Sequence, residues 1–475
     1  MSRRLAPALV LGFPCFAGFP RGAAAHGFGQ RYDLPLPLAL YACGAALTIV
    51  VSCVMFALYA RAPRPQGYAR WDLLSTGIGR ALASAGSIAA LRLAAVVVFL
   101  FLLFAGFFGN QNAFRNVVPV MVWAIGWVGL AYFSALVGDA WKVVNPFETM
   151  FAAAERLSAS PGPRLRLPAS VEAWPAVALY LLFLWLETSW PGADSPRGIA
   201  TAMAAYAVAT WIGMWLFGRE EWLARGEVFA LVFGILARFA PSHIELDARR
   251  RVTAWHLRPY AVGLFENAPL DSSRTALVLV MLAAVTFDGF LETPAWAAIV
   301  ELSAGEDSRL LRTAGLLLTP LLFGLLYLGS CRLIALAGGL RPGTSRARIA
   351  GLFVLTLVPI AIAYLLAHYL SFIVQAAQYL VPLASDPLGW GWNLFSTANA
   401  FVRVSVLDAR FVWIASVAAI VTGHIAALYL AHSLSMREFA DRARARRSQF
   451  PMLVLMVAYT MTSLWIIAQP IVSSR

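Results

Sequence analysis

The sequence predicts an all-α, polytopic integral membrane protein, a helical bundle with about ten transmembrane helices. The 475-residue chain is 60% hydrophobic and its mean hydropathy is +0.72, whereas soluble domains are roughly 45–50% apolar. The apolar residues form long uncharged runs, such as 93–109 and 349–366, and about 20 such residues cross a bilayer core. A transmembrane β-barrel would instead show short segments of alternating polarity, and the sequence has no such segments.

Residues 1–25 have the pattern of a cleavable signal peptide. Arg3 and Arg4 precede a short apolar segment, and three alanines precede His26, as at an A-x-A-like cleavage site. Cleavage would leave a mature N-terminus that begins HGFGQRYDLPLPL outside the cytoplasm; an uncleaved anchor helix is the alternative. An N-terminal histidine can bind copper through its α-amine and imidazole together. His26 is therefore a candidate copper ligand.

Residues 26–475 form a single predicted transmembrane domain. Each span is predicted from an apolar run of sufficient length, bounded by a polar loop or by a loop that contains proline or glycine. The predicted spans are 35–59, 91–109, 117–138, 174–190, 198–217, 275–300, 310–335, 349–382, 411–433 and 451–470. Two amphipathic segments, near 68–88 and 219–240, are predicted to lie at the inner face without crossing. The second of them also fits a re-entrant helix, because its apolar run is short.

The positions of the basic residues predict the orientation. These residues gather after alternate spans, at 61–70, 142–166, 249–258, 341–348 and 442–447, and the intervening loops contain few of them. Cytoplasmic loops of membrane proteins are enriched in lysine and arginine, so basic loops are expected after every second span. We therefore expect a multi-pass protein of the bacterial inner membrane, with the mature N-terminus outside the cytoplasm.

The net charge of +13 is explained by these loops rather than by nucleic-acid binding, since no basic run is interleaved with aromatic residues. The lipid bilayer is the expected partner of the chain. The sequence leaves the oligomeric state open.

The stretch VTFDGFLETPAW, residues 285–296, places Asp288 and Glu292 within an apolar run. A charged group at membrane depth costs roughly 2.5–3.5 kcal/mol, so each carboxylate needs a partner or a hydrated cavity. Residues four apart would share one helix face, and Gly289 and Pro294 would loosen the helix beside them. A functional site is one interpretation, and a structural ion pair with a nearby arginine is the other.

Glu187, His368 and His424 also lie in predicted spans, at a depth where they could meet Asp288 and Glu292. Carboxylates and imidazoles are the ligands of zinc and manganese, and a bound metal would supply hydroxide as a nucleophile. A metal-free site is the alternative, with a carboxylate as general base and a histidine that orients or donates. A third possibility is that each histidine only bonds a neighbouring helix. We expect catalytic roles for Asp288, Glu292, His368 and His424, and these residues together with Glu187 are the candidate metal ligands.

Four stretches, HGFGQRYDLPLPL, VTFDGFLETPAW, AHYLSFIVQ and TGHIAALYLAH, resemble a family of bacterial multi-pass membrane proteins labelled fenitrothion hydrolase. Members are described as membrane-bound organophosphorus hydrolases, and the resemblance extends from residue 26 to about residue 435. It implies hydrolysis of the P–O bond of an aryl phosphorothioate, with release of a nitrophenol. Such a lipophilic small-molecule substrate would reach an intramembrane cavity through the bilayer. Two alternative functions are a transporter or ion-coupled permease that uses the same carboxylates, and a copper-handling membrane protein whose site begins at His26.

Overall fold

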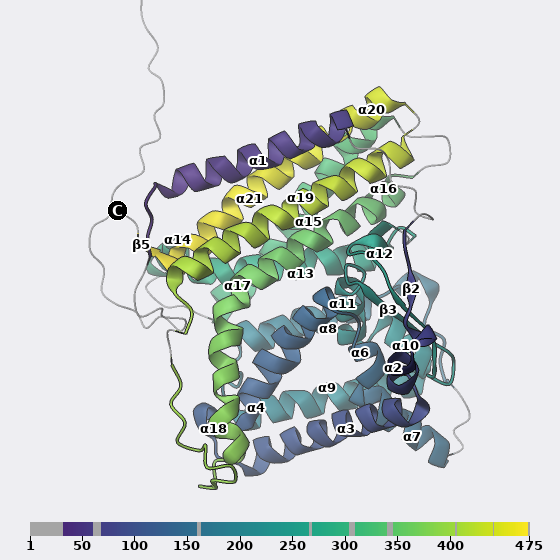
Figure 1. The fold of residues 1–475 in the computed structure, drawn as a ribbon, viewed down its shortest axis with the longest axis vertical. Helices are drawn as coiled ribbons and strands as arrows, with labels where there is room; N and C mark the ends of the chain where they lie inside the picture. Colours follow the sequence, from purple (N-terminus) through teal and green to yellow (C-terminus); the bar gives the residue numbers. More distant parts are fainter. Residues whose placement is uncertain are drawn as a thin grey trace, which may run out of the picture.

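The computed structural model describes residues 32–59, 68–158, 163–265, 268–303, 309–339, 345–403, 406–439 and 441–473. Within these residues, ten helical segments are long and apolar enough to cross a membrane. They pack side by side in one bundle (Figure 1). The predicted all-α polytopic fold is therefore confirmed. The predicted signal peptide and His26 lie outside the described residues.

The ten segments begin and end close to the predicted bounds. Six of them are single helices: α1 (Leu38–Tyr59), α3 (Ala85–Phe108), α9 (Pro196–Phe217), α13 (Ser272–Leu291), α15 (Arg309–Gly338) and α19 (Ala409–Glu438). The third segment consists of α4 (Val117–Pro119), a π-helical part (Val120–Gly129) and α5 (Leu130–Leu136), and the fourth of a 3-10 turn (Ala169–Val171) and α8 (Trp174–Ser189). The eighth consists of α16 (Arg346–Phe353), a 3-10 turn (Val354–Leu357), α17 (Val358–Gln378) and α18 (Leu380–Ser385), and the tenth of α20 (Arg442–Arg447) and α21 (Phe450–Ile471). The sixth differs most from its prediction, because it ends at Leu291 and a separate helix, α14 (Pro294–Leu302), follows.

The centre of the bundle is formed by α13 and by the run from α16 into the first half of α17. Their most apolar windows are 72% and 94% buried inside the protein, whereas the corresponding window of α1 is 17% buried. An apolar helix that is buried on all sides belongs to a bundle core. The helices α1, α3 and α15 instead present leucines outward, including Leu93, Leu321 and Leu325. Their outer faces are the apolar surface that a bilayer would cover.

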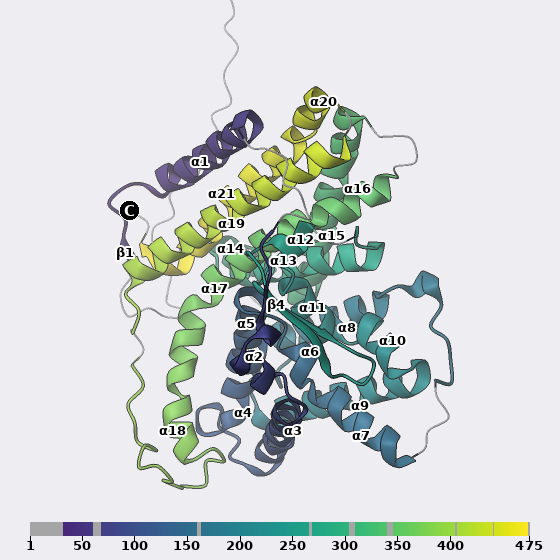
Figure 2. The same cartoon turned by 45° about the vertical axis from the view of Figure 1, so that its right-hand side comes forward.

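One end of the bundle holds a small antiparallel sheet (Figure 2). Its strands are β2 (Trp71–Asp72), β3 (Ser242–Leu246) and β4 (Val252–Leu257), in the order β2-β4-β3. The 3-10 turn Leu73–Ser75 and the short helices α2 (Gly77–Leu82), α6 (Trp141–Val144), α7 (Pro146–Ser158) and α12 (Val262–Phe265) complete this end. The segment 249–258 was predicted only as a basic loop, so the hairpin was not predicted.

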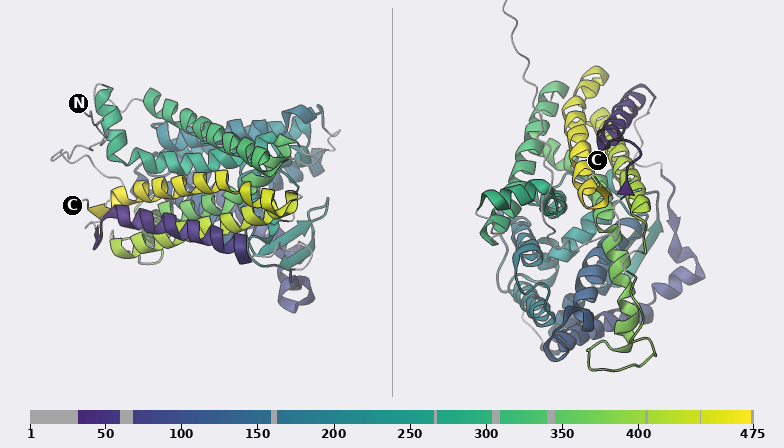
Figure 3. Two further views of the ribbon diagram at one scale, coloured as in Figure 1. Left: turned by 90° about the horizontal axis from the view of Figure 1, so that it is seen from above. Right: turned by 90° about the vertical axis from the view of Figure 1, so that its left-hand side faces the viewer.

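At the opposite end the two ends of the described chain meet. Strand β1 (Tyr32–Asp33) pairs in parallel with β5 (Val472–Ser473), and both lie at the left of the left-hand view in Figure 3. Helix α14 and the 3-10 turn Ala113–Arg115 also belong to this end. Of the predicted basic loops, the described segments 142–158, 249–258 and 442–447 lie at the sheet end instead.

Two helices occupy the segment predicted to lie at the inner face near 219–240. Helix α10 (Arg219–Arg225) carries the charges, and α11 (Val228–Leu236) is short and largely buried against α5, α6 and α8. Val228, Val232 and Phe233 are fully buried. Helix α11 is therefore a short helix packed inside the protein, and a re-entrant course in the membrane stays a prediction.

Candidate functional site

Asp288 lies in the last turn of α13, just before the helix ends. The end has a local cause: Pro294 occupies the first turn of α14, and the Thr293 side chain caps that helix by accepting a hydrogen bond from Trp296 N at 3.3 Å. Glu292 is the C-terminal cap of α13 and has left the helical conformation, with φ −90° and ψ 3°. Asp288 and Glu292 therefore stand in the last turn and at the cap of the same helix, and Thr293 and Pro294 begin a separate helix after them.

Asp288 and His368 come together across the contact between α13 and α17. His368 Nε2 lies 2.8 Å from Asp288 Oδ2, and Tyr369 Oη donates a hydrogen bond to the same oxygen at 3.0 Å. Since a carboxylate can only accept, the ring nitrogen that faces it carries the proton. The side chain of His368 is 14% exposed and that of Asp288 is 32% exposed. The two residues that the sequence analysis placed at similar depth are thus direct partners.

Gly289 allows this close approach of the helices. A Cβ atom at this position would lie 2.7 Å from Ile466 Cγ2 and 3.1 Å from Tyr364 Oη. The Tyr364 ring is stacked on His368, with centroids 6.3 Å apart and an interplanar angle of 10°. Its hydroxyl is buried and has no hydrogen-bond partner within the described part of the chain. A larger residue at 289 would therefore separate α13 from the polar face of α17.

A second polar group lies beyond Tyr364. Thr286 Oγ1 and Tyr459 Oη are 2.7 Å apart, and the Tyr459 ring lies 6.1 Å from the Tyr364 ring and 6.0 Å from the His424 ring, between centroids. His424 Nδ1 bonds Ile420 O at 2.8 Å, and its Nε2 has no hydrogen-bond partner among the described residues. His424 is thus separated from the Asp288–His368 pair by two tyrosine rings.

The remaining two predicted site residues, Glu187 and Glu292, lie close to the Asp288–His368 pair. Glu187, at the end of α8, is close enough for its charge to act on Asp288 and on Tyr369. Glu292 acts in the same way on Tyr364 and shares a cavity with His368. Within the described residues, no three histidine, cysteine or acidic side chains are arranged to hold a metal ion. The zinc or manganese site stays a prediction.

A small cavity lies beside His368, with a volume of about 30 Å³. One water molecule needs roughly 10–15 Å³ by this kind of measure, so about two waters fit. Its polar lining comes from Glu292, His368, Tyr369 and Ser371, and its apolar lining includes Phe372, Val412 and Ile471. The imidazole that Asp288 orients thus borders a space of the size of a water molecule.

No family model, curated protein or solved structure matches this chain. The predicted resemblance to organophosphorus hydrolases therefore stays a prediction. The copper site at His26 also stays one, since that residue lies outside the described part.

Three contributors to the site were not identified from the sequence: Tyr369, Tyr459 and Thr286. Tyr369 follows His368 directly and lies off the spacing of three and four residues that marks one helix face. Tyr459 and Thr286 have neighbours of ordinary composition for a span. A search for tyrosines directly beside buried ionisable residues in the sequence would have selected Tyr369 but not Tyr459 or Thr286.

Proposed function

We propose that this protein is an intramembrane hydrolase of a neutral, lipophilic ester and that it activates water with the Asp288–His368 pair. The observation that carries the proposal is the 2.8 Å contact between His368 Nε2 and Asp288 Oδ2 beside a cavity that fits water. A carboxylate that fixes the tautomer of an imidazole leaves the other ring nitrogen as an acceptor. That nitrogen is suited to act as a general base toward a water molecule.

In the proposed reaction His368 takes a proton from water while the water oxygen attacks the phosphorus of an aryl phosphorothioate triester. The P–O bond to the aryl group breaks, and the aryl oxygen leaves with the bonding electron pair as a nitrophenolate. The proton held by His368 then returns to the products. Asp288 stabilises the imidazolium that forms between these steps, and Tyr369 holds the carboxylate in place.

The substrate class is supported by the fold and by the resemblance described above. Aryl phosphorothioates are neutral and lipid-soluble, so they would reach the protein from the bilayer. The cavity beside His368 is too small for the whole substrate, and we therefore place the aryl group at its apolar rim, near Phe372, Val412 and Ile471. The reacting ester would lie toward the imidazole.

Release of nitrophenol from fenitrothion or methyl parathion by the purified protein in detergent tests the proposal. We expect turnover that is lost in His368→Asn and retained in His432→Asn, a matched buried histidine whose Nδ1 bonds Gln449 Oε1 at 3.0 Å. Turnover that resists a chelator supports the metal-free route, and turnover that zinc or manganese restores after chelation supports the metal route. No turnover by a well-folded, monodisperse protein would reject the hydrolase.

The second candidate is an ion-coupled permease in which the same groups carry protons. It is favoured by the succession Asp288, His368, Tyr364, Tyr459 and His424, in which adjacent rings lie close together. Intramembrane carboxylates and histidines are common in proton pathways. Proton uptake into reconstituted vesicles, abolished by Asp288→Asn and accompanied by no ester turnover, would favour this function.

The proposed orientation places the sheet end in the cytoplasm of a bacterium and the Asp288 site toward the outer side of the inner membrane. The basic segments at 249–258 and 442–447 lie at the sheet end, in agreement with the positive-inside rule. Labelling of single cysteines introduced at Arg249 and at Asn393 by an impermeant reagent would test this orientation in intact cells.

A further inference from the structure

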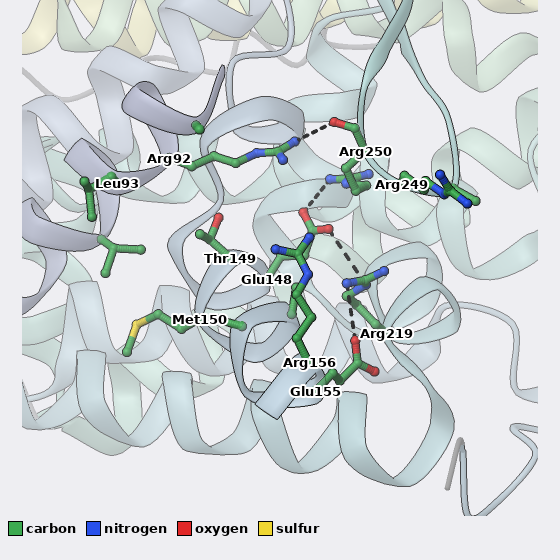
Figure 4. A pocket seen from close by; sticks show the side chains of 15 residues that line it. Arg92, Leu93, Glu148, Thr149, Met150, Glu155, Arg156, Arg219, Arg249 and Arg250 are labelled. Atoms are coloured by element: carbon green, nitrogen blue, oxygen red, sulfur yellow. Dashed lines mark hydrogen bonds and ion pairs between the residues drawn. The ribbon is translucent and has the colours of Figure 1, made fainter. Parts of the chain in front are cut away.

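A large cavity near the sheet end is lined by arginines. It has a volume of about 730 Å³ and lies between α3, α7, the start of α10 and the turn that joins β3 to β4 (Figure 4). Five arginines and two glutamates line it. They are Arg92, Arg156, Arg219, Arg249, Arg250, Glu148 and Glu155. The cavity therefore has an excess of three positive charges.

Both glutamates form ion pairs with arginines of the cavity, and their negative charges neutralise only part of the positive charge. Arg250 Nη2 lies 2.5 Å from Glu148 Oε2, and Arg219 lies 3.9 Å from Glu148 and 3.3 Å from Glu155. Arg92 donates to two backbone carbonyl oxygens, Val143 O at 3.0 Å and Arg250 O at 2.9 Å, instead of to a carboxylate. Positive charge without a carboxylate partner in a cavity attracts an anion.

Several guanidinium groups keep donors available. The Nε atoms of Arg219 and Arg250 are buried and have no hydrogen-bond partner within the described part of the chain. Arg156 and Arg249 have no ion pair within 4.0 Å among the described residues. Arg250 adopts a left-handed backbone conformation, with φ 61°, which a non-glycine residue seldom adopts without a compensating contact. Guanidinium groups with free donors are suited to phosphate oxygens.

An apolar track leads from this cavity along the outside of α3. Leu93 lines the cavity and is 63% exposed, and Leu100 and Phe104 follow on the same side of the helix at 47% and 44% exposure. Residues 7 and 11 positions apart on a helix share a face. At 1.5 Å per residue the track is about 16 Å long, which is roughly half of a bilayer core. A free phosphate would not need such a track, whereas the acyl chain of a lipid would.

We propose that this cavity binds the phosphate-containing headgroup of an anionic phospholipid, whose acyl chain lies along Leu93, Leu100 and Phe104. Basic pockets between transmembrane helices are suited to such headgroups. A lipid bound there would contact α3, α7 and the β3–β4 turn at once and would hold these three elements together. The inference depends on the fold and on the arginines, and it is independent of the chemistry proposed at Asp288.

Native mass spectrometry of the purified full-length protein tests this site with phosphatidylglycerol, phosphatidylcholine and inorganic phosphate as probes. We expect phosphatidylglycerol to bind at least tenfold more tightly than phosphatidylcholine. Binding should weaken about 25-fold in Arg156→Gln/Arg249→Gln, because each arginine near the membrane surface contributes roughly fivefold. Both side chains are exposed, so this variant keeps the pairs formed by Glu148.

The matched control is Arg442→Gln/Arg446→Gln, which removes two exposed arginines from α20 at the same end. This variant should bind phosphatidylglycerol as the wild type does. Equal binding of the two lipids, or equal weakening in the control, would overturn the site. Inorganic phosphate that binds as tightly as phosphatidylglycerol would overturn the lipid as its ligand.

Discussion

Two carboxylates of this protein, the buried Glu227 and the partly exposed Asp288, have different surroundings. Glu227 is fully buried and accepts hydrogen bonds from Tyr206 Oη at 2.6 Å, Trp141 Nε1 at 3.0 Å and Ala230 N at 2.6 Å. It is also the N-terminal cap of α11. Asp288 is less buried, and it faces an imidazole and a phenol beside a cavity.

The comparison shows that burial alone does not identify a reactive carboxylate. The donors around Glu227 are mostly backbone, indole and amide groups, which hold a fixed charge in place and order three helices around it. The main partner of Asp288 is a histidine, which can exchange a proton near neutral pH. We therefore assign a structural role to Glu227 and a chemical role to Asp288.

The largest expected effect is on turnover at the Asp288 site. His368→Asn should lower the rate of nitrophenol release about 10²–10⁴-fold, because a general base contributes that much. The bundle should remain folded, since asparagine keeps a polar group toward Asp288. A variant that unfolds in detergent, or that keeps the wild-type rate, would assign His368 the structural role given to Glu227.

The second effect is on the stability of the Glu227 centre. Glu227→Gln places an amide donor against the donors that now surround the carboxylate, and each unsatisfied buried group costs about 1–3 kcal/mol. We expect a lower melting temperature in detergent and an unchanged turnover per folded molecule. Glu220→Gln, on the exposed side of α10, is the matched control and should not change the melting temperature. Loss of turnover in folded Glu227→Gln would contradict the division of roles.

A smaller effect is expected when one hydrogen bond to Asp288 is removed. Tyr369→Phe removes the donor at 3.0 Å, and a net hydrogen bond to a charged group contributes about 1.5–3 kcal/mol. Turnover should fall by about tenfold or more, while substrate affinity changes little. The control is Tyr132→Phe, which removes a phenol that donates to Leu365 O and Leu366 O on α17, the helix that carries Tyr369. This variant should leave turnover unchanged. Equal losses of turnover in both variants would indicate a general packing effect.

The smallest effect is the pH dependence of stability at Glu227. Burial raises the pKa of Glu227, although the hydrogen bonds from Tyr206 and Trp141 oppose the shift. Stability from a group with a raised pKa is fully present below its ordinary value of 4.5 and declines as pH rises through the raised value. The melting temperature of the wild type relative to Glu227→Gln should therefore decrease as pH rises from 4.5 through the raised pKa. A difference that increases with pH would have the wrong sign.

The transmembrane scaffold could be predicted from the sequence because a bilayer needs long apolar runs, which are visible in one dimension. The β3–β4 hairpin could not, because its strands flank a strongly charged turn and are only five and six residues long. The sixth span was predicted too long, because the break depends on the Thr293 cap as well as on Pro294.

For the site, depth in the membrane and helix face could be predicted from the sequence, whereas the neighbours of each side chain could not. Depth was sufficient to select Asp288 and His368, which do meet. Depth could not distinguish His424, which lies behind two tyrosines, from the residues that contact Asp288. Glu227 was missed because its charged neighbours in the sequence resemble those of an exposed helix. The arginine cavity was also missed, because it joins residues from α3, α7 and a hairpin that was not predicted.

A double-mutant cycle for Asp288→Asn and His368→Asn tests the central claim most directly. If the two residues act as one unit, the double variant will release nitrophenol within about threefold of the rate of His368→Asn alone, since the second change removes nothing further. If the two losses multiply, or if either single variant keeps the wild-type rate, Asp288 and His368 do not form a catalytic pair.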